Sequence, residues 1–378
     1  MQAAYLDNNA TTAPSPAVRD RILEVLSAEG LGNASSPHAL GRRARARIES
    51  ARDAVARLTG ADPLQVVFTS GCTEANNTVL QRALEPPRRL ITSATEHASV
   101  REPAAWLEAQ GIEVTRLSGP WGRIDPAALA EALERPAALV SIQWANGETG
   151  VLQPIAELAE VCRAAGVPLH VDAAQAVGRE PIGFEELGID YLSFSGHKLH
   201  APQGVGALLA RDPQGLPRLL RGGGQEGGCR AGTENLPGIV GLGAACEERA
   251  EGFETATGWI RRLRDRFEAE ALAAVPGTEV NAHDVPRVGN TTSLRFPVDG
   301  QAMMAQLEAL GVHCSQSSAC SGQTPAASEI LTAVGLSAEA AFASVRFSVS
   351  AMTTEHEIDQ AVRALATAYE RLRALETL

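Results

Sequence analysis

Lysine is almost missing from this chain of 378 residues, because Lys198 is the only lysine among its 33 Lys plus Arg residues. Positive charge is also in short supply, since 45 Asp plus Glu residues leave a formal net charge of −12 at pH 7. Nucleic acid backbones and anionic membrane surfaces both attract clustered cations. No run of basic residues occurs here, so we expect neither nucleic acid nor membrane as a partner.

Long apolar runs are absent too, and no stretch approaches the roughly 18 apolar residues that cross a bilayer. The first ten residues lack the basic and apolar regions of a secretion signal. The six cysteines show neither a CxxC motif nor the spacing of zinc ligands. These absences predict a cytoplasmic protein with reduced thiols and no metal site, in which any special cysteine is special for its reactivity.

Short apolar runs alternate with helix-length segments over the first two thirds of the chain, which predicts an α/β fold with a mostly parallel sheet. The expected strands are 66–69, 90–93, 114–117, 138–143, 169–172, 191–194 and 205–209. The last two are too close for a helical crossover, which favours antiparallel neighbours. The expected helices are 14–29, 42–58, 73–84, 98–110, 126–134 and 155–165, the first with Val18, Ile22, Val25 and Leu26 on one face.

The order of predicted helices and strands changes after the glycine-rich stretch 222–232. One long helical region is expected at 236–272, and strands at 291–296 and 344–350 are then combined with helices at 301–310 and from 354 onward. This mixture predicts a second, smaller α+β domain. We expect a large domain at 14–255 and a small domain formed by 1–13 together with 256–378.

Polar and titratable residues follow several of the predicted strands, and ligands of open α/β sheets bind at this edge. Lys198 is the most specific functional candidate among these residues. Arginine supplies nearly every cation in this chain but cannot act as an amine nucleophile, so a lone lysine at a strand end suggests Schiff-base chemistry. A leftover surface lysine explains this single fact equally well.

Two further strand ends carry candidate cofactor contacts. Beside a ring nitrogen, the carboxylate of Asp172 would keep a pyridinium protonated, although a helix cap or a buried ion pair is the commoner role for such a residue. The segment Ser70-Gly71-Cys72-Thr73 opens a predicted helix, where backbone N–H groups and the Thr73 hydroxyl can hold a phosphate. A simple helix cap is the alternative.

The remaining candidates each have an ordinary explanation as well. His97 either stacks over a flat cofactor or is a core histidine, and Asn146 and Gln175 either bond a phenolate oxygen or hold turns. Cys320 lies among small polar residues and has a nucleophilic thiol, but an incidental cysteine such as Cys314 arises easily. Arg346 offers a bidentate fork for an α-carboxylate or for a salt bridge.

Ten motifs follow one another along the chain: YLDNNATT (5–12), NASSPH (33–38), SGCTEANN (70–77), TEHASV (95–100), NGETG (146–150), HVDAAQ (170–175), SFSGHK (193–198), RAGTEN (230–235), SSACSG (317–322) and SVRFS (344–348). In this order and spacing they make the whole chain resemble the cysteine desulfurase family, a group of pyridoxal-phosphate (PLP) enzymes within the class-V aminotransferase superfamily. SSACSG resembles the reactive loop of the first class of that family. The resemblance implies the type I PLP-enzyme fold.

The resemblance also implies a role for each candidate. Lys198 would hold PLP and later move protons at the substrate α-carbon, and Cys320 would take the sulfur. Asn146 and Arg346 would hold the substrate carboxylate. The other cofactor contacts implied are Asp172 at the pyridinium, His97 stacked on the ring, Gln175 at the phenolate oxygen, Cys72, Thr73, Ser195 and His197 at the phosphate, and Thr233 at the phosphate of a partner subunit.

The function implied is conversion of L-cysteine to L-alanine, with a persulfide formed on Cys320 and passed to an acceptor protein by a homodimer. A selenocysteine lyase or an aminotransferase of the same fold is the nearest alternative, and a non-catalytic sulfur-relay scaffold is another. Three positions depart from the family pattern: Trp144 replaces a common histidine, Gly227 replaces a frequent arginine, and 324–328 differs after Cys320. These departures leave the PLP contacts intact. They bear on the mobility of the loop that carries Cys320 and on the identity of the sulfur acceptor.

Overall fold

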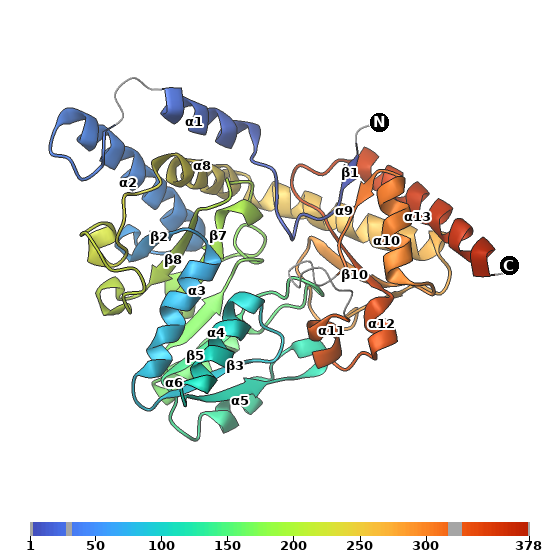
Figure 1. Ribbon diagram of the computed structural model, residues 1–378, viewed down its shortest axis with the longest axis horizontal. Coiled ribbons are helices and arrows are strands. Elements are labelled where there is room, and N and C mark those ends of the chain that lie inside the picture. Colours follow the sequence, from blue (N-terminus) through green and yellow to red (C-terminus); the bar gives the residue numbers. More distant parts are fainter. Residues whose placement is uncertain (1–2, 28–31, 317–326, 377–378) are drawn as a thin grey trace.

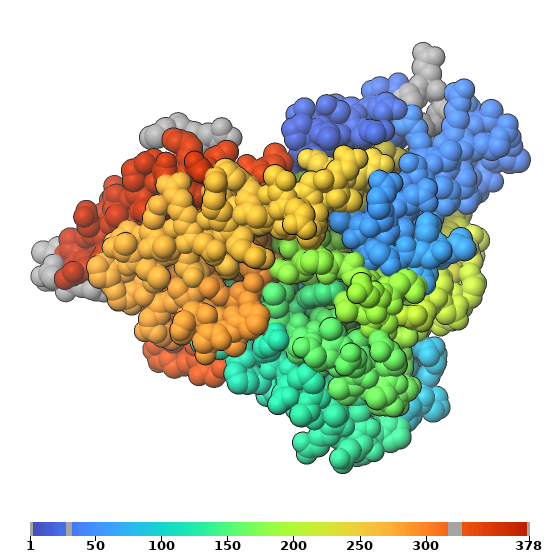
Figure 2. Space-filling model, turned by 180° about the vertical axis from the view of Figure 1, so that it is seen from behind, coloured from blue at the N-terminus to red at the C-terminus, as the bar shows by residue number. Residues whose placement is uncertain are grey.

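The computed structural model describes residues 3–27, 32–316 and 327–376. Two domains of unequal size lie side by side (Figure 1). The larger one holds most of the blue-to-green elements, and the smaller one holds the orange-to-red elements together with the blue strand β1. From the opposite side, the yellow helices α8 and α9 run along both domains (Figure 2). Both domains take part in the site described below.

A seven-stranded sheet forms the centre of the large domain. Its strand order is β2-β8-β7-β6-β5-β3-β4. Neighbours from β7 to β4 are parallel, whereas β8 is antiparallel to both β7 and β2. The strands are β2 (Val66–Thr69), β3 (Arg89–Ser93), β4 (Glu113–Leu117), β5 (Leu139–Gln143), β6 (Leu169–Asp172), β7 (Tyr191–Ser195) and β8 (Gly206–Ala210).

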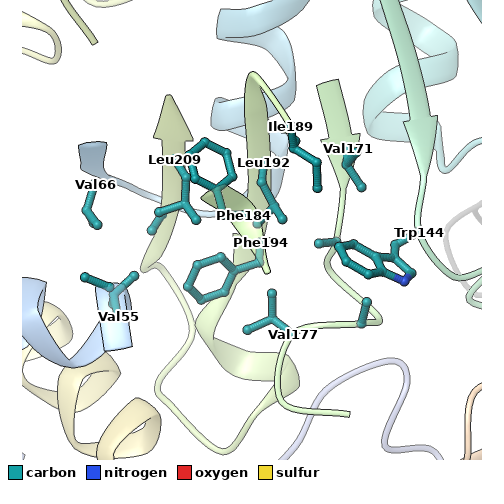
Figure 3. Close-up of a cluster of buried hydrophobic side chains, with 14 of the residues drawn as sticks. Val55, Val66, Trp144, Val171, Val177, Phe184, Ile189, Leu192, Phe194 and Leu209 are labelled. Carbon is teal, nitrogen blue, oxygen red and sulfur yellow. The ribbon is translucent and has the colours of Figure 1, made fainter. Parts of the chain in front are cut away.

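Both faces of this sheet are covered, because successive side chains of a strand point to opposite faces. Val66 belongs to a hydrophobic cluster with α2, α6 and α8, whereas Val67 belongs to a second cluster with α3 and α4. Figure 3 shows part of the first cluster, including Trp144 at the end of β5. The helices are α1 (Pro16–Ser27), α2 (Ala39–Thr59), α3 (Cys72–Leu80), α4 (Ala98–Ala109), α5 (Pro126–Ala132), α6 (Ile155–Ala165), α7 (Phe184–Leu187) and α8 (Leu236–Glu251).

The small domain packs helices against two short sheets. Strand β10 lies between β12 and β9 and is antiparallel to both, and β1 pairs in parallel with β11. A separate hydrophobic cluster unites Ala4 and Leu6 with residues from α9, β10, β12 and α13. The elements are β1 (Ala4–Tyr5), α9 (Phe253–Ala274), β9 (Glu279–Val280), β10 (Thr291–Arg295), α10 (Gly300–Ala309), β11 (Val312–His313), α11 (Glu329–Ala333), α12 (Ala338–Phe342), β12 (Ser344–Ser348) and α13 (Glu355–Glu376).

The predicted α/β fold, with a mostly parallel sheet and a smaller α+β domain, is confirmed. The single helical region expected at 236–272 is wrong in one respect, because α8 and α9 are separate helices that meet at Gly252, a residue type of low helix propensity. Leu26 was expected on one face of α1 with Val18, Ile22 and Val25, but it is 63% exposed, whereas Val18 and Val25 are buried. Over the described residues, every helix is too short or too polar to span a membrane.

Candidate active site

Most of the candidate residues from the large domain meet where β6 and β7 end. Lys198 lies in a short 3-10 turn directly after β7. Its Nζ donates to the backbone carbonyls of Asn9 and, at 2.8 Å, Ala10. The Asn9 carbonyl also accepts from Gln175 Nε2 at 3.1 Å. The N-terminal segment therefore holds both predicted side chains through one backbone oxygen.

Asp172 is the last residue of β6 and is only 5% exposed. One of its oxygens, Oδ2, accepts from Asn76 Nδ2 at 2.8 Å. The other, Oδ1, accepts from Ala174 N at 3.0 Å and from Cys72 Sγ at 3.3 Å. A buried carboxylate needs such donors, and here they fix its orientation.

The start of α3 provides a site for an anion. Its N-cap residue, Gly71, has no side chain with which to cap the helix, so the positive end of the helix dipole is left for another acceptor. Cys72 N donates to Ser195 Oγ at 2.7 Å. A Cβ at residue 71 would come within 3.2 Å of the same Oγ, so glycine keeps this approach open.

His97 is the N-cap of α4, and its Nδ1 lies 3.1 Å from Ser99 N and 2.8 Å from Ser99 Oγ. The imidazole is otherwise exposed. It lines a cavity of about 450 Å³ together with Thr73 and Trp106. The predicted stacking residue and a predicted phosphate contact therefore border the same space.

Next to Lys198, His197 Nδ1 lies 3.1 Å from Thr11 Oγ1. Burial, with the nearby charges of Lys198 and Arg179, lowers the pKa of His197 to about 4. The imidazole is therefore neutral at physiological pH. Arg179 in turn donates to the Lys198 carbonyl at 3.1 Å and to the Gln175 side chain.

Of the two predicted carboxylate-binding residues, Arg346 reaches across the domains to the residue that follows the other, Asn146. Arg346 on β12 of the small domain donates from Nη1 to the Gly147 carbonyl at 3.1 Å and from Nη2 to Asp7 Oδ1 at 2.6 Å. Among the described residues, its buried Nε has no hydrogen-bond partner. The side-chain oxygen of Asn146 accepts from Glu148 N and Thr149 N, both at 2.9 Å.

Two candidate residues are not brought into this group. Thr233 is exposed, in the loop between the 3-10 turn Glu226–Gly228 and α8. Cys320 lies outside the described residues. On either side of it along the chain, Ser315 forms a backbone bridge with Arg346, and Ser328 Oγ donates to Glu148 Oε2 at 2.5 Å.

Sequence reasoning missed several residues that hold the site together. The motifs YLDNNATT and SGCTEANN contain Asp7, Asn9 and Asn76, but no role was assigned to any of them. Asn9 acts through its backbone carbonyl. Every residue type carries this group, so the identity of residue 9 gives no signal of the contact. Asp7 and Asn76 are polar residues within these two motifs, and that position was the available signal.

Comparisons with known proteins identify the family of the chain. The model of the Aminotransferase class-V family matches residues 4–361, so the chain belongs to that class. A cysteine desulfurase from Nostoc sp. is 43% identical over 99% of this chain and 95% of its own length. By structure, a NifS-like protein has a TM-score of 0.89 with 31% identity over 98% of this chain and all of its own. SspA in complex with cysteine has a TM-score of 0.82 with 32% identity over 93% of this chain and all of its own.

Within the class-V aminotransferases, the chain belongs to the cysteine desulfurase family.

Proposed function

We propose that the protein uses PLP to convert L-cysteine to L-alanine and keeps the released sulfur as a persulfide on Cys320. The observation that carries the proposal is the meeting of Lys198, Asp172 and the uncapped start of α3 at one sheet edge, in a chain of this family. A neighbouring structure, SspA, is a complex with cysteine, which supports L-cysteine as the substrate.

The residues present fit PLP as a donor set. An amine at Lys198 suits its aldehyde, the buried anion of Asp172 suits its ring nitrogen, and the uncapped start of α3 with Thr73 and Ser195 suits its phosphate. The exposed face of His97 would stack on the ring, and Gln175, Cys72 and His197 would complete the contacts. When bound, PLP withdraws electrons from the α-carbon of an amino acid and so labilises its α-proton.

The protein side chains would then move the proton and hold the substrate. Lys198, displaced by the substrate amine, would take and return the proton at the α-carbon. Arg346 retains a buried Nε–H with no partner among the described residues, which supports a role in binding the substrate carboxylate. Asn146 lies beside it through the Gly147 carbonyl.

Cys320 would attack the substrate sulfur. Its thiolate forms an S–S bond with the substrate sulfur while the bond between that sulfur and the substrate β-carbon breaks. The β-carbon then takes a proton, which gives alanine. The atoms balance without an added oxidant: L-cysteine and one thiol give L-alanine and one persulfide. Among the described cysteines, burial raises the pKa of Cys162 and Cys314 to about 12 and also raises those of Cys72 and Cys246, so these thiols are poor nucleophiles.

Purified protein with L-cysteine tests this proposal, with alanine measured and the persulfide located by mass spectrometry. We expect Cys320→Ser to keep the PLP colour but lose alanine and sulfide release. Cys314→Ser, the matched control six positions away, should retain both. Continued desulfuration by Cys320→Ser, or a keto acid in place of alanine, would contradict the proposal and favour a lyase or an aminotransferase of the same fold.

We further propose a cytoplasmic homodimer in which Thr233 reaches the phosphate of the partner subunit. The exposure of Thr233 supports this arrangement. Lys198→Ala and Thr233→Ala subunits should each be inactive alone, and mixing them should restore activity because one site of each mixed dimer is intact. An inactive mixture whose subunits have exchanged would contradict the shared site.

We also propose the domain division 14–255 against 1–13 with 256–378, which the separate hydrophobic clusters support. The Cys320 persulfide would pass to an acceptor protein, for which an iron–sulfur cluster scaffold is a candidate. Pull-down of such a scaffold by the persulfide form, but not by Cys320→Ser, tests the acceptor.

A further inference from the structure

A chain of hydrogen bonds crosses the buried face of the large sheet that α3 covers. Ser141 Oγ on β5 lies 2.8 Å from His170 Nδ1 on β6, and His170 Nε2 lies 3.1 Å from Ser193 Oγ on β7. Ser193 Oγ then donates to Asn76 Oδ1 on α3. All four residues are fully buried.

Asn76 continues the chain in two directions. Its two N–H groups go to Asp172 Oδ2 at 2.8 Å and to Ser99 Oγ at 2.9 Å. Ser99 Oγ lies 2.8 Å from His97 Nδ1. One buried amide thus links the carboxylate proposed for the cofactor ring nitrogen with the imidazole proposed to stack on that ring.

The donor and the acceptor of each hydrogen bond in this network can be assigned. Ser99 N donates to His97 Nδ1, which makes this nitrogen an acceptor, so in the neighbouring contact the Ser99 hydroxyl donates to Nδ1 while its oxygen accepts from Asn76. Nδ1 is therefore an acceptor, and the ring hydrogen sits on Nε2. At the other end, Ser193 donates to Asn76, so it accepts from His170 Nε2, whose Nδ1 accepts from Ser141.

The state of His170 agrees with this assignment. Burial lowers the pKa of His170 to about 4, although the charge of Asp172 opposes the effect. The imidazole is therefore neutral at physiological pH and can accept at Nδ1 while it donates from Nε2. Each buried polar group of the chain then has a partner, as buried networks require.

We propose that Asn76 and Ser99 are positioning residues that together set the orientation of the Asp172 carboxylate and the Nε2–H tautomer of His97. This inference rests on the proposed function, because it assigns the two oriented groups to the cofactor. Cys72, one helical turn before Asn76, holds the second carboxylate oxygen and so shares in fixing Asp172. A helix that presents its start to an anion thereby orients two further contacts from its inner face.

Two measurements test the proposal in protein labelled with ¹⁵N-histidine. The first is the tautomer of His97 in the PLP-free protein, read from its ¹⁵N shifts and assigned with His97→Gln. The second is the dissociation constant of PLP. The variants are Asn76→Ala, Ser99→Ala and the conservative Ser99→Thr, with Asn77→Ala as control because Asn77 is the next residue of α3 and bonds Thr73 O.

We expect Asn76→Ala and Ser99→Ala to move the two ¹⁵N shifts of His97 toward each other and to weaken PLP binding roughly tenfold to hundredfold. Ser99→Thr and Asn77→Ala should match the unaltered protein in both measurements. If Asn76→Ala folds and gives the same His97 shifts and the same PLP affinity as Asn77→Ala, the proposal is wrong. A failed desulfurase assay would count against the proposed function alone, because the tautomer is read without PLP or cysteine.

Discussion

The two halves of the site are held in different ways. The cofactor half, around Asp172 and His97, is supported from within the large domain by a buried chain of hydrogen bonds. The carboxylate half depends on Arg346, which comes from the small domain and bonds Asp7 and Gly147. Asp172 and His97 are thus fixed by the packing of one domain, although Lys198 and Gln175 of the same half are held by N-terminal carbonyls. The Arg346 half exists only while both domains and the N-terminal segment are in register.

The energetic consequences differ as well. In the cofactor half the partners are mostly neutral donors, and a lost bond there leaves one unsatisfied buried group. In the other half, Arg346 and Asp7 form a largely buried ion pair with side chains 8% and 18% exposed. Removal of one partner from such a pair typically costs about 3–5 kcal/mol, because the other charge stays buried.

The largest effect is expected at Lys198. Lys198→Arg keeps the charge but removes the amine, so alanine formation should fall by about 10²- to 10⁴-fold. Because the chain has a single lysine, borohydride reduction with PLP should label one peptide, the one that contains Lys198. Label at the N-terminal amine alone, or activity retained by Lys198→Arg, would contradict the assignment of the cofactor half.

Arg346→Gln should separate the two halves. Loss of a charge-assisted fork costs about 1.5–3 kcal/mol, which corresponds to a KM for L-cysteine roughly tenfold to hundredfold higher. The affinity for PLP should stay the same, since the supports of Asp172 and His97 lie within the large domain. The double variant Arg346→Gln with Asp7→Asn controls for the unpaired Asp7 charge. An equal loss of PLP affinity would show that the halves are not independent.

A smaller effect, on stability, is expected from a change at Glu96, the residue that precedes His97 in the sequence. Its Oε1 accepts from Ser93 Oγ and from Gln143 N. Burial raises the pKa of Glu96 to about 8, from a usual 4.5, although its hydrogen bonds oppose the rise. Between these values the folded protein keeps a proton that the unfolded chain has lost. The free energy of unfolding therefore falls as pH rises through this window, by at most about 1.4 kcal/mol per unit.

Glu96→Gln removes this titration. Its stability relative to the unaltered protein should rise steadily between pH 5 and pH 8, as measured by urea unfolding. Glu102→Gln, which removes an exposed carboxylate from α4, is the control for the substitution itself. A constant difference for Glu96→Gln would show that its carboxyl titrates normally.

The smallest effect is expected from Gly147→Ala, where the two halves touch. The added Cβ would lie 3.3 Å from Gln175 Nε2, so the side chain must shift by a few tenths of an ångström. We expect a KM change of only about twofold to threefold, because volume changes at a yielding neighbour cost little. Gly258→Ala on the exposed side of α9, where a Cβ meets open space, should change the melting temperature but not KM.

The sequence predicts the backbone elements better than the contacts between residues. Strands β2 to β8 were predicted almost to the residue, because runs such as Val66–Thr69 are buried on both faces and carry a continuous apolar signal. The break at Gly252 was missed because the apolar pattern continues through it. Strands β1 and β11, of two residues each, have no pattern of their own and form only by pairing with each other.

The site shows the same division. Lys198 and Asp172 were predicted as site residues because strand ends mark where ligands bind, and both lie at strand ends in the structure. Their supports were not found, since Asn76 and Ser99 lie 23 positions apart and meet only when α3 packs beside α4. Asn9 contributes a backbone oxygen, and residue identity carries no information about such a contact.

The pairing of β1 with β11 also sets an order on the synthesis of the protein. Ala4 leaves the ribosome long before its strand partner, Val312, which follows only after every strand of the large sheet has been made. Until then, the carbonyls of Asn9 and Ala10 that hold Lys198 have no fixed place relative to the large sheet. The segment around β1 thus takes its place later than the large sheet that follows it in sequence, and a nascent chain with a complete large sheet still lacks a positioned lysine.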